Sequence, residues 1–341
     1  MVITNFYYSE LDAQETNENA TLFFFAFNRL SKKEGYHKRL KSKYPQATIV
    51  MFSTAGHFIS DKIEDDNELV CVLEFEKSSV KARSYSSEDF ESDYQLGSCI
   101  GSDLESDAKA LILITDGGLI NGTDLIKGVN THTNAGLQIL GGIAGDGTRF
   151  KDTLVGLDEE PRSGQIAAVA LFGEELEIVS RHDSGWSSLG LEFLITKSDK
   201  NKLIELNNKN AYEILSEFMH SETDESFTHN MLYYPFFVED ELNEGVIRTP
   251  IAVDHVGKTI TYAGNMPIGS TVKLMKSRTM QLLDSTFDLA NECISESSLN
   301  EFIFAISCVG RRVVLQDMAN EEFVELNNVF GSNAKYFGFY S

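Results

Sequence analysis

The chain has 341 residues, of which 42% are hydrophobic, and 52 acidic against 29 basic residues give it a net charge of −23. This length predicts two domains at roughly 150 residues each, and the apolar content is sufficient for buried cores. The strong negative charge repels nucleic-acid phosphates and anionic membrane surfaces, so we expect neither a nucleic-acid partner nor membrane association.

From the N-terminus, the sequence shows no sign of export or membrane insertion. Residues Met1–Tyr8 lack the basic region and the cleavable apolar stretch of a secretory signal. The longest apolar run, Leu22–Phe27, is far shorter than the about 20 residues that a membrane-spanning helix needs. The cysteines form no CxxC pair, which excludes zinc-ribbon and thioredoxin-like motifs. We therefore expect a cytoplasmic protein with reduced thiols.

Short apolar runs alternate with amphipathic segments through the first part of the chain. Several of these runs are continuous, which is typical of strands covered on both faces. The predicted strands are Thr21–Phe27, Thr48–Phe52, Leu69–Phe75, Leu111–Thr115, Leu137–Leu140, Gln165–Phe172 and Leu191–Thr196. The predicted helices are Lys32–Tyr44, Thr123–Asn134 and Asn210–His220.

The acidic, polar stretch from His220 to Ser226 is the best candidate for a domain boundary, with a surface loop inside one domain as the alternative. Mixed strands and helices on both sides predict an α/β fold, with α+β as the alternative, in two domains of mixed β-sheets covered by helices. The predicted domains are residues 1–220 and 221–341. Beyond the boundary we predict strands over Val246–Val253, Thr271–Lys276 and Glu301–Ser307 and a helix from Arg278 to Cys293.

Ser53-Thr54-Ala55-Gly56 directly follows a predicted strand. A glycine at this position allows the backbone to turn sharply and to approach a ligand closely. The hydroxyls of Ser53 and Thr54 have two interpretations, as ligand donors or as caps of the turn. Asp116 follows a later strand in the same way, and a turn or helix cap is favoured there over a metal ligand or a substrate contact.

The segment from Leu140 to Gly147 holds four glycines, at positions 141, 142, 145 and 147. Such density indicates a tightly curved backbone that packs closely against another part of the molecule. The segment lacks the lysine of a P-loop, and Thr148–Leu157 reads as a strand rather than as a helix that would hold a phosphate. We therefore expect no mononucleotide site here.

Three positions in the second half of the chain are candidates for ligand contacts. Trp186, next to Gly185, is either a stacking surface for a ligand ring or a core anchor. Arg311 follows a predicted strand, where its guanidinium would hold a ligand carboxylate through two hydrogen bonds, or else satisfy carbonyls and acidic side chains of the chain itself. Asn265 offers a donor and an acceptor, although a turn before Pro267 explains it equally well.

Catalysis is not expected from these residues. Cys308, near Arg311, is the best nucleophile candidate, but no general base is assignable to it. Ser53 lacks the GxSxG turn that exposes a nucleophile. No two of the seven histidines stand at a recognisable ligand spacing, so the sequence predicts no metal site, and His57 and His182 are the only haem-ligand candidates near the motifs.

The order and spacing of these motifs resemble the FIST family, with an N-terminal and a C-terminal FIST domain covering the chain from about Phe23 onward. The first domain is similar in its STAG turn, its TDG strand end, its GGIAGDG loop and its Gly-Trp pair, followed by Ile204-Glu205-Leu206-Asn207. The second is similar over Gly264–Ser270 and Ser307–Arg312. His57 departs from the acidic residue often found in the family. The family pattern also continues past Tyr340, whereas this sequence ends at Ser341, so either the sequence is trimmed or the second domain lacks its last strand.

The resemblance implies an intracellular sensory protein that binds a small ligand, such as an amino acid or another small carboxylate. It implies signalling to a partner such as a histidine kinase or a chemoreceptor-type protein. The alternatives are a haem-binding nitric-oxide sensor that acts on a histidine kinase, and an interaction adaptor without a small ligand. No catalytic residue and no certain cofactor are expected. The predicted ligand-binding residues are Ser53, Thr54, Gly56, His57, Gly141, Gly142, Gly145, Asp146, Trp186, Asn265, Cys308 and Arg311.

Overall fold

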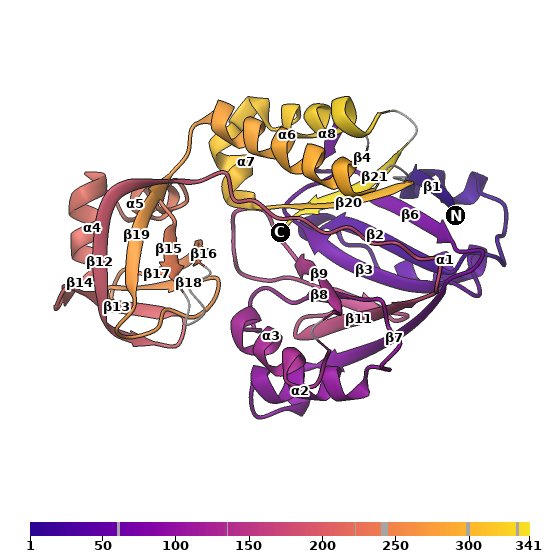
Figure 1. The fold of residues 1–341 in the computed structure, drawn as a ribbon, viewed down its shortest axis with the longest axis horizontal. Helices are drawn as coiled ribbons and strands as arrows, with labels where there is room; N and C mark the ends of the chain where they lie inside the picture. Colours follow the sequence, from indigo (N-terminus) through magenta and orange to yellow (C-terminus); the bar gives the residue numbers. More distant parts are fainter. Residues whose placement is uncertain (60–61, 135, 222, 240–244, 298–300, 332–333) are drawn as a thin grey trace.

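The computed structural model describes residues 1–59, 62–134, 136–221, 223–239, 245–297, 301–331 and 334–341. The chain folds into a large body and a smaller lobe (Figure 1). Both ends of the chain contribute to the body, and residues 187–276 form the lobe between them. The fold is α/β, with mixed sheets covered by helices, as predicted from the sequence.

The first sheet of the body has the order β1-β6-β2-β3-β10. Its central strands β2 and β3 are parallel, and the short helix α1 connects them and covers one face with Tyr36 and Leu40. Phe24 points to the other face, where its ring stacks on Phe304 and Phe337 from the C-terminal end of the chain. The elements are β1 (Val2–Tyr7), β2 (Leu22–Asn28), α1 (Tyr36–Lys43), β3 (Thr48–Thr54), β6 (Leu69–Glu74) and β10 (Val155–Leu157).

A second sheet, β7-β11-β8-β9, packs its inner face on the same core and carries α2 and α3 on its outer face. The elements are β7 (Ser79–Ser86), α2 (Asp93–Asp103), β8 (Ala110–Thr115), α3 (Gly122–Asn130), β9 (Gln138–Ile143) and β11 (Gln165–Phe172). Short 3-10 turns occur at Tyr8–Ala13, Arg29–Ser31, Ser87–Asp89 and Gln316–Met318.

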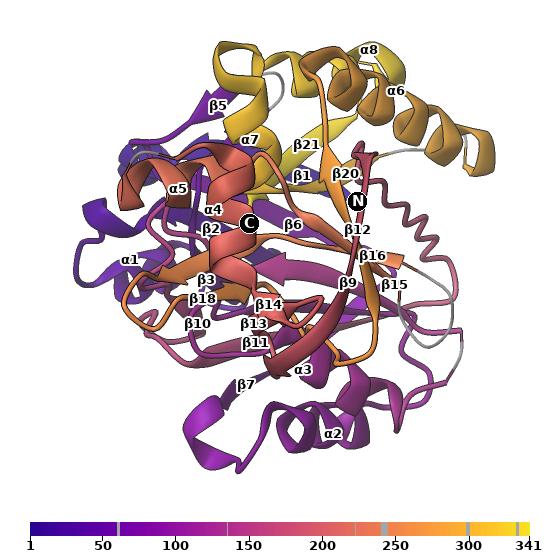
Figure 2. The ribbon, with the colours of Figure 1, turned by 90° about the vertical axis from the view of Figure 1, so that its left-hand side faces the viewer.

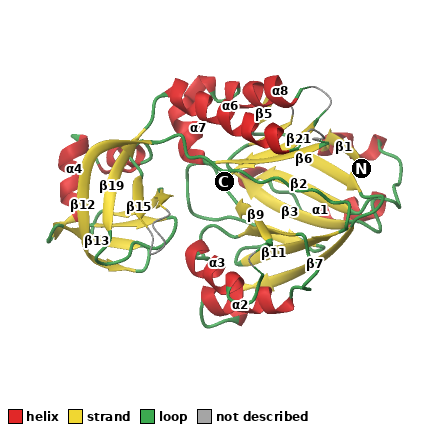
Figure 3. Ribbon diagram, in the orientation of Figure 1, coloured by secondary structure: helices red, strands yellow, loops and turns green. Residues whose placement is uncertain are grey.

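A third sheet, β20-β21-β4-β5, pairs the two C-terminal strands with the two short strands that follow β3. Its last strand, β21, runs antiparallel to β4, with Gly338 opposite Phe58 and Phe339 opposite His57. Three helices cover its outer face, and Figure 3 shows them along one side of the strands. The elements are β4 (His57–Ile59), β5 (Lys62–Glu64), α6 (Thr279–Glu296), β20 (Phe302–Ser307), α7 (Val309–Leu315), α8 (Glu321–Phe330) and β21 (Lys335–Tyr340). This pairing brings the turn after β3 next to the C-terminal helices.

The lobe has an antiparallel sheet of order β16-β15-β19-β12-β13-β18-β17, with β14 beside β13. Its core lies between this sheet and the two helices α4 and α5. The predicted boundary near residue 220 falls within the lobe, whose strand β13 pairs with β18 across it. The elements are β12 (Ser187–Asp199), β13 (Lys202–Leu206), β14 (Lys209–Asn210), α4 (Ala211–Met219), α5 (Asp224–Met231), β15 (Phe236–Glu239), β16 (Gly245–Arg248), β17 (Pro250–Asp254), β18 (Thr259–Tyr262) and β19 (Thr271–Lys276).

Predicted strands in the first part of the chain are confirmed to within a few residues as β2, β3, β6, β8, β9, β11 and β12. The helix predicted over Lys32–Tyr44 was too long, because Gly35 has a φ of 81° and the helix begins only after it. The strand predicted over Val246–Val253 is divided into β16 and β17 ahead of Pro250, which lacks the backbone donor that a continuous strand uses. Within the described residues, no helix is long and apolar enough to cross a membrane.

Candidate functional site

The carboxyl ends of β2 and β3 meet at one edge of the first sheet, where ligands commonly bind in parallel α/β sheets. The glycine-rich loop after β9 and helix α7 reach the same edge. Together they surround a cavity of about 170 Å³. The cavity is lined by Asn28, Leu30, Thr54, Ala55, Gly56, Asp65, Asp146, Gly147, Thr148, Arg149 and Arg312.

The turn after β3 is held by strand β21. The Ala55 amide donates to the Tyr340 carbonyl at 3.0 Å, and the Tyr340 amide donates to the Gly56 carbonyl at 2.7 Å. Gly56 has a φ of 113°, and a Cβ atom there would overlap Nη1 of Arg312. Both observations explain why glycine stands at this position: the backbone is left-handed, and a guanidinium lies directly against it.

Arg312, on α7, brings a positive charge to the cavity. Its guanidinium donates to both carboxylate oxygens of Asp65, at 2.7 and 2.6 Å, and to the Ala55 carbonyl at 2.6 Å. It also lies over the Tyr340 ring, 5.3 Å from the ring centroid. The fork geometry makes this a bidentate pair, and Asp65 remains about half exposed to solvent.

The loop after β9 is organised by Asp146, which is almost fully buried. Its carboxylate accepts hydrogen bonds from the amides of Phe150, Lys151 and Asp152, at 2.8, 2.9 and 3.1 Å. Arg149 donates from Nε to the Asp146 carbonyl at 2.8 Å. Within the described residues, the Nη1 and Nη2 atoms of Arg149 have no hydrogen-bond partner. A second guanidinium at the cavity is therefore available to a ligand.

The glycines at the end of β9 and in the loop that follows it allow close packing. A Cβ atom at Gly141, whose φ is 123°, would overlap the Leu113 carbonyl, and one at Gly145 would overlap the Ala55 amide. Gly142 faces Ile306 of β20. The expectation of a closely packed backbone is confirmed, but the expected tight curvature is wrong for Gly141 and Gly142, which continue strand β9 beside β8. Gly145 brings this loop against the turn after β3, so the two motifs singled out in the sequence lie side by side.

Ser53 and Thr54 stabilise backbone near the cavity. The Ser53 hydroxyl accepts from the Leu154 amide at 2.9 Å and is fully buried. The Thr54 hydroxyl accepts from the Gly56 amide at 3.3 Å and lies 3.0 Å from Nδ1 of His57. These contacts support the interpretation of both hydroxyls as groups that stabilise the turn, although Thr54 also lines the cavity.

His57 is buried behind the turn, with both ring nitrogens engaged. Nε2 lies 2.5 Å from the Asn67 carbonyl, which only accepts, so Nε2 carries the proton and Nδ1 accepts from Thr54. Burial lowers the pKa of His57 from its ordinary value of 6.5. With both nitrogens occupied, His57 offers no free lone pair to a haem iron. Among the described residues, no group of three or more His, Cys, Asp or Glu side chains is placed to hold a metal ion.

The lowered pKa of His57 predicts a specific loss of stability in mild acid. Below the ordinary pKa of 6.5, the unfolded chain protonates this histidine while the folded chain does not. The unfolded state then binds more protons, so the free energy of unfolding falls as the pH falls, by at most about 1.4 kcal/mol per pH unit. Urea unfolding measured between pH 6.5 and 4.5, the ordinary glutamate value, follows this loss, and comparison with a variant that lacks the histidine separates it from carboxylate titration.

A His57→Asn variant is the reference for this measurement. It is expected to be less stable overall and to show a shallower dependence on pH between 6.5 and 4.5. An equally steep dependence in the variant would show that His57 is not the group responsible.

The other predicted site residues lie outside the cavity. Asn265, in the lobe, donates to Asp124 and accepts from Asn121, both at 2.7 Å, and so joins the lobe to the start of α3. Cys308 caps α7, where its sulfur accepts from the Gly310 amide at 3.3 Å. Trp186 is half-buried at the start of the lobe. None of these three lines the cavity.

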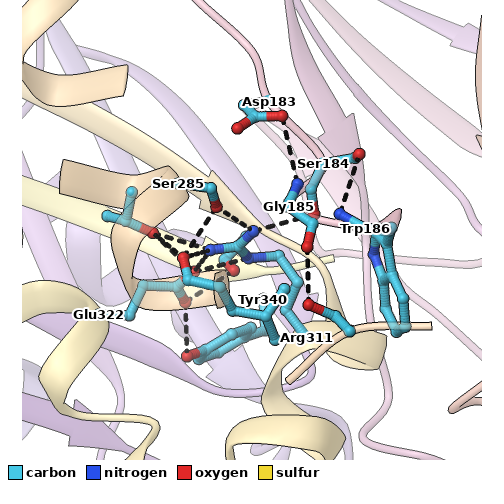
Figure 4. A network of polar contacts seen from close by, with 12 residues as sticks. Asp183, Ser184, Gly185, Trp186, Ser285, Arg311, Glu322 and Tyr340 are labelled. Carbon is cyan, nitrogen blue, oxygen red and sulfur yellow. Dashed lines mark hydrogen bonds and ion pairs between the residues drawn. The ribbon is translucent and has the colours of Figure 1, made fainter. Parts of the chain in front are cut away.

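Arg311 holds a carboxylate, but the carboxylate belongs to Glu322 of the chain itself (Figure 4). Its Nε donates to Glu322 at 2.7 Å, and its Nη atoms donate to Ser285, Thr286 and the carbonyls of Leu282 and Ser184. Every N–H group of this buried guanidinium is engaged. This arrangement matches the interpretation of Arg311 as a residue that satisfies carbonyls and an acidic side chain.

Several cavity residues were not predicted from the sequence. Arg312 is adjacent to Arg311, and Gly147 and Arg149 adjoin the predicted Asp146, so the motifs were located correctly but the residues within them were not. Asn28 ends β2 as Thr54 ends β3, and this strand-end position was the available signal. Asp65 has no comparable sequence signal, because only the pairing of β4 and β5 brings it to Arg312.

Comparison with known protein families gives two matches that together cover nearly the whole chain. A model of the FIST N domain matches residues 19–209, and a model of the FIST C domain matches residues 211–341. No curated protein matches the chain.

Proposed function

Because the chain belongs to the FIST family, whose domains are associated with sensory signal transduction, we propose that it is a sensor that binds a small α-amino acid or related carboxylate in the cavity at the ends of β2 and β3. Binding reports to a signalling partner, such as a histidine kinase or a chemoreceptor-type protein. The protein acts by binding alone and catalyses no reaction.

One observation carries the proposal, the pairing of charges at the cavity. Arg149 has free Nη atoms for a carboxylate, and the half-exposed Asp65 has lone pairs for an ammonium group. Arg312 and Asp65 already form an ion pair in the free protein. A zwitterion adds a carboxylate, which Arg149 binds, and an ammonium group, which Asp65 binds, so no charge at the cavity is left without a partner. This arrangement also offsets, locally, the repulsion that a chain of net charge −23 exerts on an anion.

The size of the cavity favours a small ligand. Its volume of about 170 Å³ is below the roughly 300–1,000 Å³ of pockets for drug-sized ligands. A haem is too large for it, and the haem alternative rests on the family resemblance alone. The cavity also distinguishes this proposal from an adaptor that binds no small ligand, since an adaptor has no need of a guanidinium that offers its Nη atoms beside a cavity.

The proposal is tested by measuring the melting temperature with each of the twenty protein amino acids. A ligand at 100 times its dissociation constant adds about 2.7 kcal/mol of stability, which raises the melting temperature by roughly 5–10 °C. We expect one amino acid or a related group to give a saturable rise. Its deaminated and decarboxylated analogues are expected to give smaller rises, because each satisfies only one of the two charged sides.

Arg149→Ala is expected to weaken binding of that amino acid by about tenfold to a hundredfold, because a charged hydrogen bond is lost. Arg162→Ala is the matched control, since Arg162 follows β10, is exposed and does not line the cavity. Equal affinity in the two variants would remove Arg149 from the site. No rise with any amino acid would favour the adaptor.

A further inference from the structure

Helix α7 lies on the side of the body where the chain passes to and from the lobe (Figures 1 and 2), and its Arg312 lines the cavity. On the lobe side, the Tyr233 hydroxyl donates to the Val313 carbonyl at 3.4 Å and accepts from Gln316, which follows the helix, at 3.3 Å. At the start of the helix, the Cys308 sulfur lies 4.0 Å from the Thr249 hydroxyl of the lobe. The helix that carries Arg312 to the cavity therefore also touches the lobe.

Two consecutive arginines of α7 contact different parts of the molecule. Successive side chains of an α-helix project about 100° apart, so Arg311 and Arg312 reach different surroundings. Arg312 reaches the cavity and Asp65. Arg311 reaches the strap, by which we mean residues 183–186, where the chain leaves the body for the lobe (Figure 4). Arg311 donates to the Ser184 carbonyl of the strap at 3.0 Å.

The segment by which the chain returns from the lobe to the body is hydrogen-bonded to the same strap. The hydroxyl of Ser277, just after β19, donates to the Gly185 carbonyl at 2.7 Å. Gly185 has a φ of 66°, and a Cβ atom there would lie 2.5 Å from the Ser285 hydroxyl and 2.8 Å from Nη1 of Arg311. The strap therefore fits closely against Arg311.

A direct series of contacts joins the two arginines through the last residues of the chain. The Arg312 guanidinium lies over the Tyr340 ring, 5.3 Å from its centroid. The Tyr340 hydroxyl donates to Glu322 at 3.2 Å, and Glu322 accepts from Arg311 at 2.7 Å. A displacement of Arg312 thus changes contacts of the residues that position Arg311.

We infer that α7 couples the cavity to the attachment of the lobe: a ligand that engages Asp65 weakens the Arg312–Asp65 pair, α7 shifts, and Arg311 loosens its hold on the strap. This inference rests on the proposed function only for the source of the displacement. The coupling itself is a property of the free protein, so it is testable without a ligand.

The test uses Asp65→Asn, which weakens the bidentate pair in the full chain, and reads out the strap. Trp186 is the only tryptophan, so its fluorescence reports this segment alone, and hydrogen exchange reports the amides of residues 184–186. We expect Asp65→Asn to accelerate exchange there by about tenfold and to shift the Trp186 emission. Asp12→Asn is the control, because it weakens another exposed Asp–Arg pair, with Arg39, away from the strap.

Two glycine variants serve as references for the Trp186 emission and the amide exchange of a strap that has moved away from Arg311. Gly185→Ala pushes the strap away from Arg311, whereas Gly190→Ala has a similar positive φ, 80°, and no neighbour within 4 Å. We expect Asp65→Asn to change emission and exchange in the same direction as Gly185→Ala, and Gly190→Ala to leave the strap amides unchanged. If Asp65→Asn behaves like Asp12→Asn, the coupling is refuted. That outcome leaves amino-acid binding untouched, and a failed amino-acid screen leaves this coupling untouched.

Discussion

Replacing Arg311 with methionine is expected to lower the free energy of unfolding by about 3–5 kcal/mol. The substitution leaves the Glu322 carboxylate buried without its cation, and its remaining donors among the described residues are the uncharged hydroxyls of Thr286, Ser307 and Tyr340. It also leaves the carbonyls of Leu282 and Ser184 without the Arg311 donors. Urea unfolding of the variant against the unmodified protein measures the loss.

The double variant Arg311→Met with Glu322→Leu tests whether the loss of stability comes from an uncompensated buried charge or from poor packing of the new side chain. Removing both charges is expected to recover most of the lost stability, because the penalty comes from one uncompensated charge. Arg83→Met, at an exposed pair with Asp103, is the surface control and is expected to cost less than about 1 kcal/mol. A loss as small as this for Arg311→Met would contradict the burial of the Arg311–Glu322 pair.

Gly141→Ala is expected to cost about 4 kcal/mol, the second largest effect. Two penalties combine at this position. The φ of 123° is strained for any residue with a Cβ atom, and that atom would overlap the Leu113 carbonyl of β8. Since β8 is hydrogen-bonded on both sides, by β9 and β11, its backbone has little freedom to retreat.

Gly147→Ala is the matched control, because Gly147 has a φ of 76° and no neighbour within 4 Å of a Cβ atom. It is expected to cost only about 1–2 kcal/mol, the strain of a left-handed residue. Thermal or urea unfolding compares the two variants directly. If the two variants lose similar amounts of stability, close packing against β8 is not the reason that position 141 requires glycine.

Local sequence patterns predicted many elements because the strands of the body are continuous apolar runs. Leu22–Asn28 and Gln165–Phe172 are buried on both faces and lie close to the predicted bounds. Strand β7 is instead exposed at four of its eight residues and buried only at Tyr85, so its sequence lacked this signal. The pairing of β4 with β21 joins residues about 280 positions apart, and no local pattern determines such a contact.

The candidate site was predicted at the level of motifs. The turn after β3 and the loop after β9 follow strands of two different sheets, and they meet at the cavity where the Gly145 amide donates to the Ser53 carbonyl at 2.8 Å. The choice between Arg311 and Arg312 depends on the direction in which α7 faces. That direction is set by packing against α6, α8 and β21, and neighbouring helical residues differ by about 100° in direction. The sequence alone does not determine it.

Hydrogen exchange of the full chain, with and without an equimolar mixture of the twenty protein amino acids, is the most direct test of the proposed site. We expect slower exchange in the turn at residues 54–56 and in the loop at residues 145–151, because a bound ligand orders both sides of the cavity. Arg149→Ala is expected to require about tenfold to a hundredfold more ligand for the same protection. Unchanged exchange in both segments at saturating mixture would contradict an amino-acid site at the ends of β2 and β3.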